Sequence, residues 1–240
     1  MLADYHVHSA FSDDSTYPME QVVRDAIRIN LDELDSMRER QGKQIRVARG
    51  LELGVQSHTI PAYERLLEEY GDRLDFTLLS IHQVGDREFW NGAFQKGRTQ
   101  EEFTMAYYEE LLQVVERFHG YSVVAHLDLI RRYDPTPGGP LPFSAVRDIV
   151  AEILSRVIAD GRGIEVNTSG WRYGLGAPQP TDDVLSLYRD LGGTIVTIGS
   201  DSHKPEHLGA YLRIAQDRLR ALGFSRACTY ECGEPRFYEL

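Results

Sequence analysis

Two histidines one residue apart, His6 and His8, follow a short apolar stretch near the start of the chain. Because side chains alternate along a strand, a strand through 2–7 directs both imidazoles to the same side. Neutral imidazole is the commonest metal ligand in proteins, so two imidazoles directed to one point favour a divalent metal ion. A single pair is weak evidence, since a histidine at a strand end is more often a hydrogen-bonded structural residue.

Residues of the same chemistry recur at or just after later apolar segments. Asp14 follows the first segment in a polar loop, and Glu52 ends the next one. The other members of the set are His82, His126, Asp201 and His203. Mixed imidazole and carboxylate ligands suit Zn, Mn or Fe. The recurrence predicts one metal centre. The remaining histidines lack this placement and are expected to be structural: His58, His119 and His207.

Strand and helix patterns alternate along the chain and must position these residues. Strands are expected over 45–53, 76–82, 121–125, 163–166 and 194–199. Helices are expected over 18–29, 35–41, 60–70, 144–159, 181–191 and 205–221, and from a capping box at 99–102 to Gly120. The alternation predicts a single α/β domain over 1–240, and six or seven strand–helix units favour a barrel with a parallel sheet. The carboxyl ends of barrel strands share one face, where active sites are built.

The composition limits the class of protein. With 26 basic and 37 acidic residues the net charge is -11, which disfavours nucleic acid as a partner and leaves a small phosphorylated substrate open. No apolar run reaches the roughly 18 residues of a membrane span and no signal peptide is visible, so we expect a cytoplasmic protein without membrane contact. The two cysteines, Cys228 and Cys232, favour a reducing compartment and are expected to be ordinary thiols.

Five motifs resemble those of the polymerase and histidinol phosphatase (PHP) family. They are His-Val-His-Ser at 6–9, Gly-Leu-Glu-Leu-Gly at 50–54, Ser-Ile-His at 80–82, Ala-His-Leu-Asp at 125–128 and Gly-Ser-Asp-Ser-His at 199–203. The first and last together are highly specific for the family, and the resemblance covers nearly the whole chain. Asn-Thr-Ser-Gly at 167–170 with Arg172, and Asp-Leu-Ile-Arg-Arg at 128–132, are similar to the histidinol phosphatase branch.

The resemblance implies a distorted (βα)7 TIM-like barrel with two or three divalent metal ions, Zn, Mn or Fe. The ligands that it implies are His6, His8, Glu52 and Asp201 for the first ion, Glu52, His82 and His126 for the second, and Asp14 and His203 for the third. Asp201 and His203 are also the expected catalytic residues. A hydroxide between the ions would attack phosphorus. Arg172, with Arg131 or Arg132, would bind the phosphate, because a guanidinium fork matches phosphate oxygens.

One departure from the family concerns its second strand, which normally ends in Thr-Asp-His and supplies a ligand of the third ion. No Thr-Asp-His occurs in the chain. Residues 30–34 resemble the start of that strand, yet they run straight into 35–38, which resemble a later helix. The join between Leu34 and Asp35 indicates a missing segment, by natural deletion, by shortening of the chain or by an omission from the sequence. If the loss is real, the barrel lacks this strand and the third ion lacks one ligand, while the first two ions keep theirs.

Three functions fit these residues. The leading hypothesis is hydrolysis of L-histidinol phosphate to L-histidinol and phosphate, a step of histidine biosynthesis and therefore of amino-acid biosynthesis. The second is another phosphoesterase of the family, acting on a different small phosphate or on nucleic-acid 3′ ends, which the acidic balance disfavours. The third is a non-catalytic metal-binding domain, made inert by the absence of Thr-Asp-His. Phosphate release from a panel of substrates separates the three.

Overall fold

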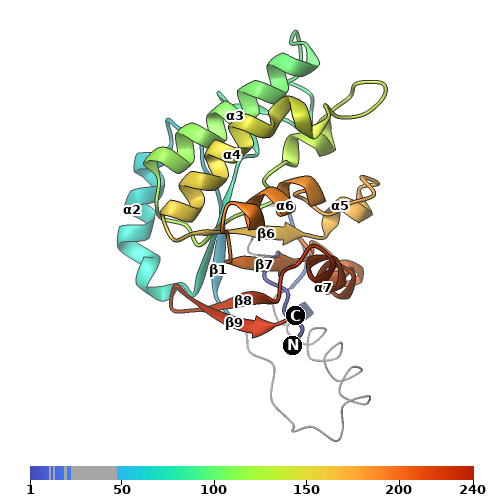
Figure 1. Cartoon of the computed structure of the whole chain (residues 1–240). Coiled ribbons are helices and arrows are strands. Elements are labelled where there is room, and N and C mark those ends of the chain that lie inside the picture. Colours follow the sequence, from blue (N-terminus) through green and yellow to red (C-terminus); the bar gives the residue numbers. More distant parts are fainter. Residues whose placement is uncertain (11, 13, 19–20, 23–47) are drawn as a thin grey trace, which may run out of the picture.

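A five-stranded parallel sheet forms the centre of the computed structural model, which describes residues 1–10, 12, 14–18, 21–22 and 48–240 (Figure 1). Its strands, in spatial order, are β1 (Gly50–Gly54), β2 (Phe76–Ser80), β5 (Val123–Val124), β6 (Gly163–Asn167) and β7 (Val196–Gly199). The last four are buried along their whole length. Full burial is typical of a parallel sheet that is covered on both faces, as the alternation of strands and helices predicts.

The amino-terminal segment 2–8 continues the sheet beyond β7. The Tyr5 amide donates to the Ile198 carbonyl at 2.9 Å, and the His8 amide donates to the Ser202 carbonyl at 2.8 Å. The strand expected at 2–7 is therefore an extended segment held parallel to β7, with one isolated bridge between Val7 and Ser202. From here to β1 the chain passes through 23–47, outside the described residues. The join of Leu34 to Asp35, the helix expected at 35–41 and most of the helix expected at 18–29 lie there.

β2 and β5 are shorter than the apolar runs that predicted them, whereas β6 ends at Asn167, one residue beyond the expected strand. β2 ends at Ser80 rather than at residue 82, and β5 consists of Val123 and Val124 alone. The backbone turns at the metal-ligand candidates that follow β5 and β7, since His126 has φ 26° and Asp201 has φ 53°. Positive φ ends an extended run and turns the chain. His126 and Asp201 therefore leave the sheet at its carboxyl edge, close to the other candidate ligands.

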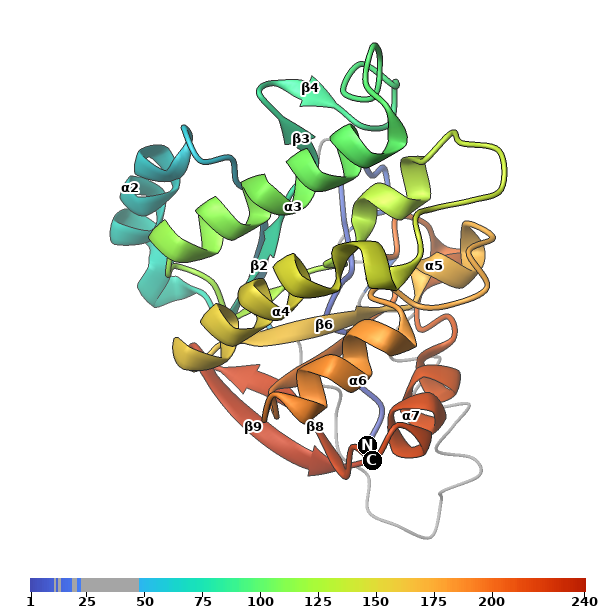
Figure 2. The same cartoon turned by 45° about the horizontal axis from the view of Figure 1, so that its top comes forward.

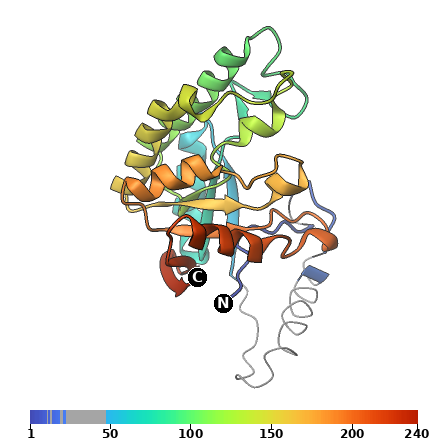
Figure 3. The same cartoon turned by 45° about the vertical axis from the view of Figure 1, so that its right-hand side comes forward.

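Helices cover the sheet (Figure 2), and most of them match the sequence prediction. From residue 48 onward the helices are α2 (Ile60–Tyr70), α3 (Gln100–Arg117), α4 (Phe143–Ala159), α5 (Ser169–Arg172), α6 (Asp182–Asp190) and α7 (Leu212–Ala221), with short 3-10 turns η1 (Gly71–Arg73), η2 (Leu129–Tyr133) and η3 (Pro205–His207). α4 packs against α3, α6 and β6, and α7 lies beside β7 (Figure 3). Among the described residues, no helix is both long and apolar enough to cross a bilayer.

The predicted capping box at the start of α3 is confirmed. The Thr99 hydroxyl accepts from the Glu102 amide at 3.2 Å, and the Glu102 carboxylate accepts from the Thr99 amide at 2.7 Å. The single helix expected over 205–221 is wrong, because η3 and α7 are separate. Gly209 and Tyr211 between them have φ values of 71° and 61°. A left-handed backbone cannot continue a right-handed helix, so the helix begins only at Leu212.

Two small antiparallel hairpins complete the described fold. β3 (Gln83–Val84) pairs with β4 (Arg87–Glu88), and β8 (Arg226–Glu231) pairs with β9 (Glu234–Glu239) at the carboxyl terminus. The second hairpin packs Cys228 and Tyr230 against inward side chains of β2 and β5. Cys228 is buried and Cys232 is exposed, and neither forms a disulfide, as predicted. No strand was expected in this carboxyl-terminal segment.

Candidate metal centre

His6 and His8 lie on the same side of the extended segment and point to the same place, as their spacing predicts. Their Nε2 atoms are 3.1 Å apart. His6 is buried, with 3% of its surface exposed, and His8 is partly buried. Main-chain hydrogen bonds of both residues to Ser202, just after β7, hold the two imidazoles above the carboxyl end of the sheet.

Glu52 lies at the centre of the site and joins two pairs of imidazoles. Its Oε2 is 3.3 Å from His6 Nε2 and 3.1 Å from His8 Nε2. Its Oε1 is 3.2 Å from His82 Nε2 and 2.9 Å from His126 Nε2. Each carboxylate oxygen therefore faces one pair, which is the geometry of a bridging ligand. Glu52 lies in the middle of β1 rather than at the end where the apolar run placed it.

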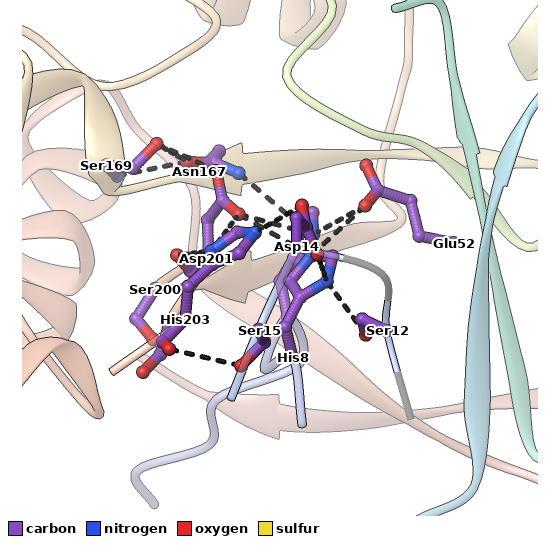
Figure 4. A network of polar contacts seen from close by, with 12 residues as sticks. His8, Ser12, Asp14, Ser15, Glu52, Asn167, Ser169, Ser200, Asp201 and His203 are labelled. Atoms are coloured by element: carbon purple, nitrogen blue, oxygen red, sulfur yellow. Dashed lines mark hydrogen bonds and ion pairs between the residues drawn. The ribbon is translucent and has the colours of Figure 1, made fainter. Parts of the chain in front are cut away.

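A second carboxylate, Asp201, faces His6 and His8 from the other side of the site. Its Oδ1 is 3.6 Å from His6 Nε2 and 3.7 Å from His8 Nε2. Figure 4 shows His8 between Glu52 on one side and Asp201 with His203 on the other. The His8 and His203 rings stack at 3.9 Å, and His203 Nε2 is 2.8 Å from Asp14 Oδ2. Asp14 is the most exposed of these groups, with 62% of its side chain accessible.

The structure thus brings together all eight residues that the sequence analysis named as metal ligands. Three groups among the described residues have ligand atoms within 4.8 Å of one another: His6, His8 and Glu52; His8, Asp201 and His203; and Glu52, His82 and His126. Asp14 adjoins the second group through His203. Imidazole nitrogen and carboxylate oxygen are the donors that zinc, manganese and iron accept, so the donor set fits a divalent metal ion. His58, His119 and His207 belong to none of these groups.

The carboxylates and imidazoles of the site shift the pKa values of His6 and Glu52 against the effect of burial. Burial lowers the pKa of His6, but the carboxylates of Glu165, Glu52 and Asp201 outweigh it and raise that pKa well above its ordinary value. Burial raises the pKa of Glu52, yet the neighbouring imidazoles hold it well below the usual range. The pKa of His126 falls, mainly because of burial. Protons and metal ions compete for these imidazoles, so metal binding releases protons and is favoured as the pH rises.

The three arginines named as phosphate ligands have different surroundings. Arg132 is buried beside the metal-ligand candidates, since its Nη2 is 3.6 Å from Asp201 Oδ2 and donates to Ser169 Oγ at 2.5 Å. Arg172 donates to the main-chain carbonyls of Ser200 and Asp201 at 3.1 and 2.8 Å. Arg131 pairs with Asp128, with its Nε 3.5 Å from Oδ2. Only Arg132 contacts a carboxylate of the metal-ligand set.

Glu165, a buried residue in the middle of β6, was missed by the sequence analysis. Its Oε1 is 2.7 Å from His6 Nδ1, and its Oε2 accepts from the Asn167 side-chain amide at 3.1 Å. A charged residue between the apolar side chains of Ile164 and Val166 was the signal that could have revealed it. Charged side chains are almost never fully buried unless they are paired.

Gly199, at the end of β7, makes room for this contact. A Cβ atom here would overlap both Glu165 Oε1 and His6 Cβ. We expect Gly199→Ala to lower the free energy of unfolding by about 1–3 kcal/mol, because the buried neighbours must shift. Gly71→Ala is the control, since its Cβ would lie at an ordinary 3.8 Å from Leu67 Cβ. Denaturant unfolding measures both variants, and equal stability of the two would contradict the overlap.

Comparison with known sequences gives one family. A family model described as PHP domain matches residues 4–169. Histidinol-phosphatase of Lactococcus lactis subsp. lactis (strain IL1403) is 26% identical over 254 residues, covering 95% of this chain and 93% of that protein. Probable histidinol-phosphatase of Thermotoga maritima is 26% identical over 234 residues, covering 93% of each. The resemblance inferred from the five motifs is confirmed.

Comparison with solved structures supports the same family. The crystal structure of the Lactococcus lactis histidinol phosphate phosphatase, complexed with zinc, L-histidinol and phosphate, superimposes with a TM-score of 0.82. The identity is 26%, and the match covers 98% of both chains. The predicted TIM-like α/β barrel is therefore confirmed.

Proposed function

Because the chain belongs to the PHP domain family, we propose that it is a metal-dependent phosphatase that hydrolyses L-histidinol phosphate to L-histidinol and phosphate. The observation that carries the proposal is Glu52, whose two oxygens face two pairs of imidazoles within 3.3 Å. Two relatives named histidinol-phosphatase support the choice of substrate, one of which holds zinc, L-histidinol and phosphate in its crystal structure.

We propose that His6, His8, Glu52 and Asp201 hold one ion, and that Glu52, His82 and His126 hold a second. Asp14 and His203 would contribute to a third, for which the chain lacks the Thr-Asp-His motif. When bound, these ions make water nucleophilic at neutral pH and neutralise the phosphoryl oxygens. Zinc, manganese and iron all suit these ligands.

The chain's own residues orient the phosphate and the metal ligands. Asp201 faces the His6–His8 pair with Oδ1 and Arg132 with Oδ2. Arg132 Nε and Nη2 donate to Gln179 Oε1 at 3.1 and 2.7 Å, so we assign Nη1 to a phosphate oxygen, as a charge-assisted hydrogen bond. The Tyr173 ring lies over Arg132, with the guanidinium carbon 4.1 Å from the ring centroid, and limits the directions in which the fork can point. Arg172 supports the same region by holding the main chain at Ser200 and Asp201.

Metal removal tests the proposal directly. Purified protein with Zn²⁺ or Mn²⁺ is expected to release phosphate from L-histidinol phosphate. Treatment with a chelator should abolish the release, and restoring the ion should recover it. No release from a protein shown to hold metal would contradict the proposal and favour the non-catalytic metal-binding domain, which the absence of Thr-Asp-His supports. Faster release from another small phosphate would identify a different phosphoesterase of the family.

We further propose a cytoplasmic enzyme, acting as a single domain on a small phosphorylated molecule rather than on nucleic acid. The net charge of -11 supports this choice, because a nucleic-acid backbone would meet an acidic surface. Phosphate release from L-histidinol phosphate is compared with release from single-stranded DNA that carries a 3′ phosphate. Equal release from both substrates would contradict the preference for a small molecule.

A further inference from the structure

We propose that Glu165 is a positioning residue that sets the orientation of two metal-binding histidines without binding metal itself. The inference rests on the proposed metal-dependent function. Glu165 belongs to none of the three groups of ligand candidates. It lies in β6, is 0% exposed and projects between the segment that carries His6 and the strand end that carries His126.

The first contact of Glu165 is with His6. Its Oε1 lies 2.7 Å from His6 Nδ1, while His6 Nε2 faces Glu52 and the rest of the ligand set. An ionised carboxylate only accepts hydrogen bonds, so Nδ1 must carry the proton in this pair. The lone pair of the neutral imidazole is then on Nε2, the atom directed at the metal centre. Metal-binding histidines usually donate their other nitrogen to a group of this kind, which fixes both tautomer and ring orientation.

The second contact of Glu165 is with the main chain of His126. Its Oε2 accepts from the His126 amide at 3.0 Å. His126 has φ 26°, an uncommon backbone conformation for a residue with a side chain. This hydrogen bond holds the turn that brings His126 Nε2 to 2.9 Å from Glu52 Oε1.

The two contacts have a joint consequence for the metal centre. His6 and His126 belong to different ligand groups, which share Glu52. One buried carboxylate thus holds a ligand of each group, at separations of 159 and 39 residues along the chain. Among the described residues it forms no ion pair with lysine or arginine, so its charge is directed to His6.

Glu165→Gln tests the inference, because the two side chains have nearly the same shape. An amide offers one accepting and one donating atom, but the three groups that face Glu165 are the His6 ring, the His126 amide and the Asn167 amide. Either orientation of the glutamine opposes two donors or imposes the wrong tautomer on His6. We expect the affinity for Zn²⁺ to fall about 10–100-fold. Competition with a chromophoric chelator, using protein stripped of metal, measures this without any substrate.

Thr197→Val is the matched control. Thr197 is the Cα partner of Glu165 on β7, is 0% exposed and has no hydrogen-bond partner for its Oγ1 among the described residues. Thr197→Val is thus a buried, nearly isosteric change in the same sheet. The Zn²⁺ affinity of this variant should stay within about 3-fold of the parent, since no ligand contact is lost. Unchanged Zn²⁺ affinity in a folded Glu165→Gln protein would overturn the inference, and so would an equal loss in both variants.

A measurement on the unaltered protein covers the case in which Glu165→Gln fails to fold. In the Zn²⁺-loaded protein, ¹⁵N NMR of the His6 ring, assigned by its loss in His6→Gln, should show a protonated Nδ1 and a metal-bound Nε2. A metal-bound Nδ1 would overturn the role of Glu165. Zn²⁺ binding with this tautomer but no phosphate release would overturn the proposed function and leave the positioning role intact. A parent that binds no Zn²⁺ would overturn both.

Discussion

Glu52→Gln is expected to reduce kcat/KM for L-histidinol phosphate by about 10³-fold or more. The carboxylate faces four imidazoles, two with each oxygen, and a neutral amide can neither bridge two ions nor balance their charge. Metal ions contribute several kcal/mol to stabilisation of the transition state, and about 4 kcal/mol corresponds to a factor of about 10³. Steady-state phosphate release at saturating Zn²⁺, together with the metal content of the variant, measures the effect.

The matched control for this prediction is Glu116→Gln. Glu116 lies on α3, and its carboxylate is 3.5 Å from Arg156 with 38% of the side chain exposed. Surface ion pairs of this kind contribute about 0–1 kcal/mol, so the control should keep its activity and its metal content. If Glu52→Gln retains the parental kcat/KM with both ions bound, the bridging role of this carboxylate is wrong.

Arg132→Lys is expected to lower kcat/KM by about 10- to 100-fold. Lysine keeps the positive charge but loses the planar guanidinium, which donates to Gln179 with Nε and Nη2 and leaves Nη1 for a phosphate oxygen. The loss of one charge-assisted hydrogen bond is worth about 1.5–3 kcal/mol, which sets this range. Arg132 is nearly buried, with 8% of its side chain exposed, and faces Asp201 of the metal-ligand set. Initial rates at several substrate concentrations separate an effect on KM from one on kcat.

The neighbouring arginine gives a sharp comparison. Arg131→Lys should have a smaller effect, because Arg131 pairs with Asp128 and is partly exposed. Arg156→Lys is the control for a change of arginine to lysine in an exposed ion pair, and it should leave activity unchanged. A larger loss from Arg131→Lys than from Arg132→Lys would reverse the assignment of the phosphate ligand. Thermal unfolding of each variant shows whether a loss of activity reflects the fold instead.

Local rules account for the helices that the sequence predicted well. The capping box at Thr99 and the spacing of apolar residues from Phe103 to Phe118 determine where α3 begins and which face it buries. Both depend on residues within a few turns of one another, and for that reason they are visible in the sequence. The break between η3 and α7 was missed, because Tyr211 adopts a left-handed backbone that its residue type does not predict.

The chemistry of the metal centre was also visible in the sequence. Alternation along a strand places His6 and His8 on one side, and apolar runs that end in histidine or a carboxylate meet at one edge of a parallel sheet. These rules follow from backbone geometry and need no knowledge of the packing. They suffice to name seven of the eight ligand candidates that the structure brings together, while Asp14 was named from the polar loop after the first segment.

The tertiary structure alone decided which groups support those ligands. The contact between Glu165 and His6 joins residues 159 positions apart, and no local pattern determines such a distance. Arg131 and Arg132 are adjacent in the sequence, yet only Arg132 reaches Asp201, because the turn η2 directs neighbouring side chains to different surroundings. The sequence by itself determined the kinds of ligand and the order in which they occur. The packing of the sheet and of the segments that follow its strands determined which of them meet, since distances across a fold depend on contacts between segments that are remote along the chain.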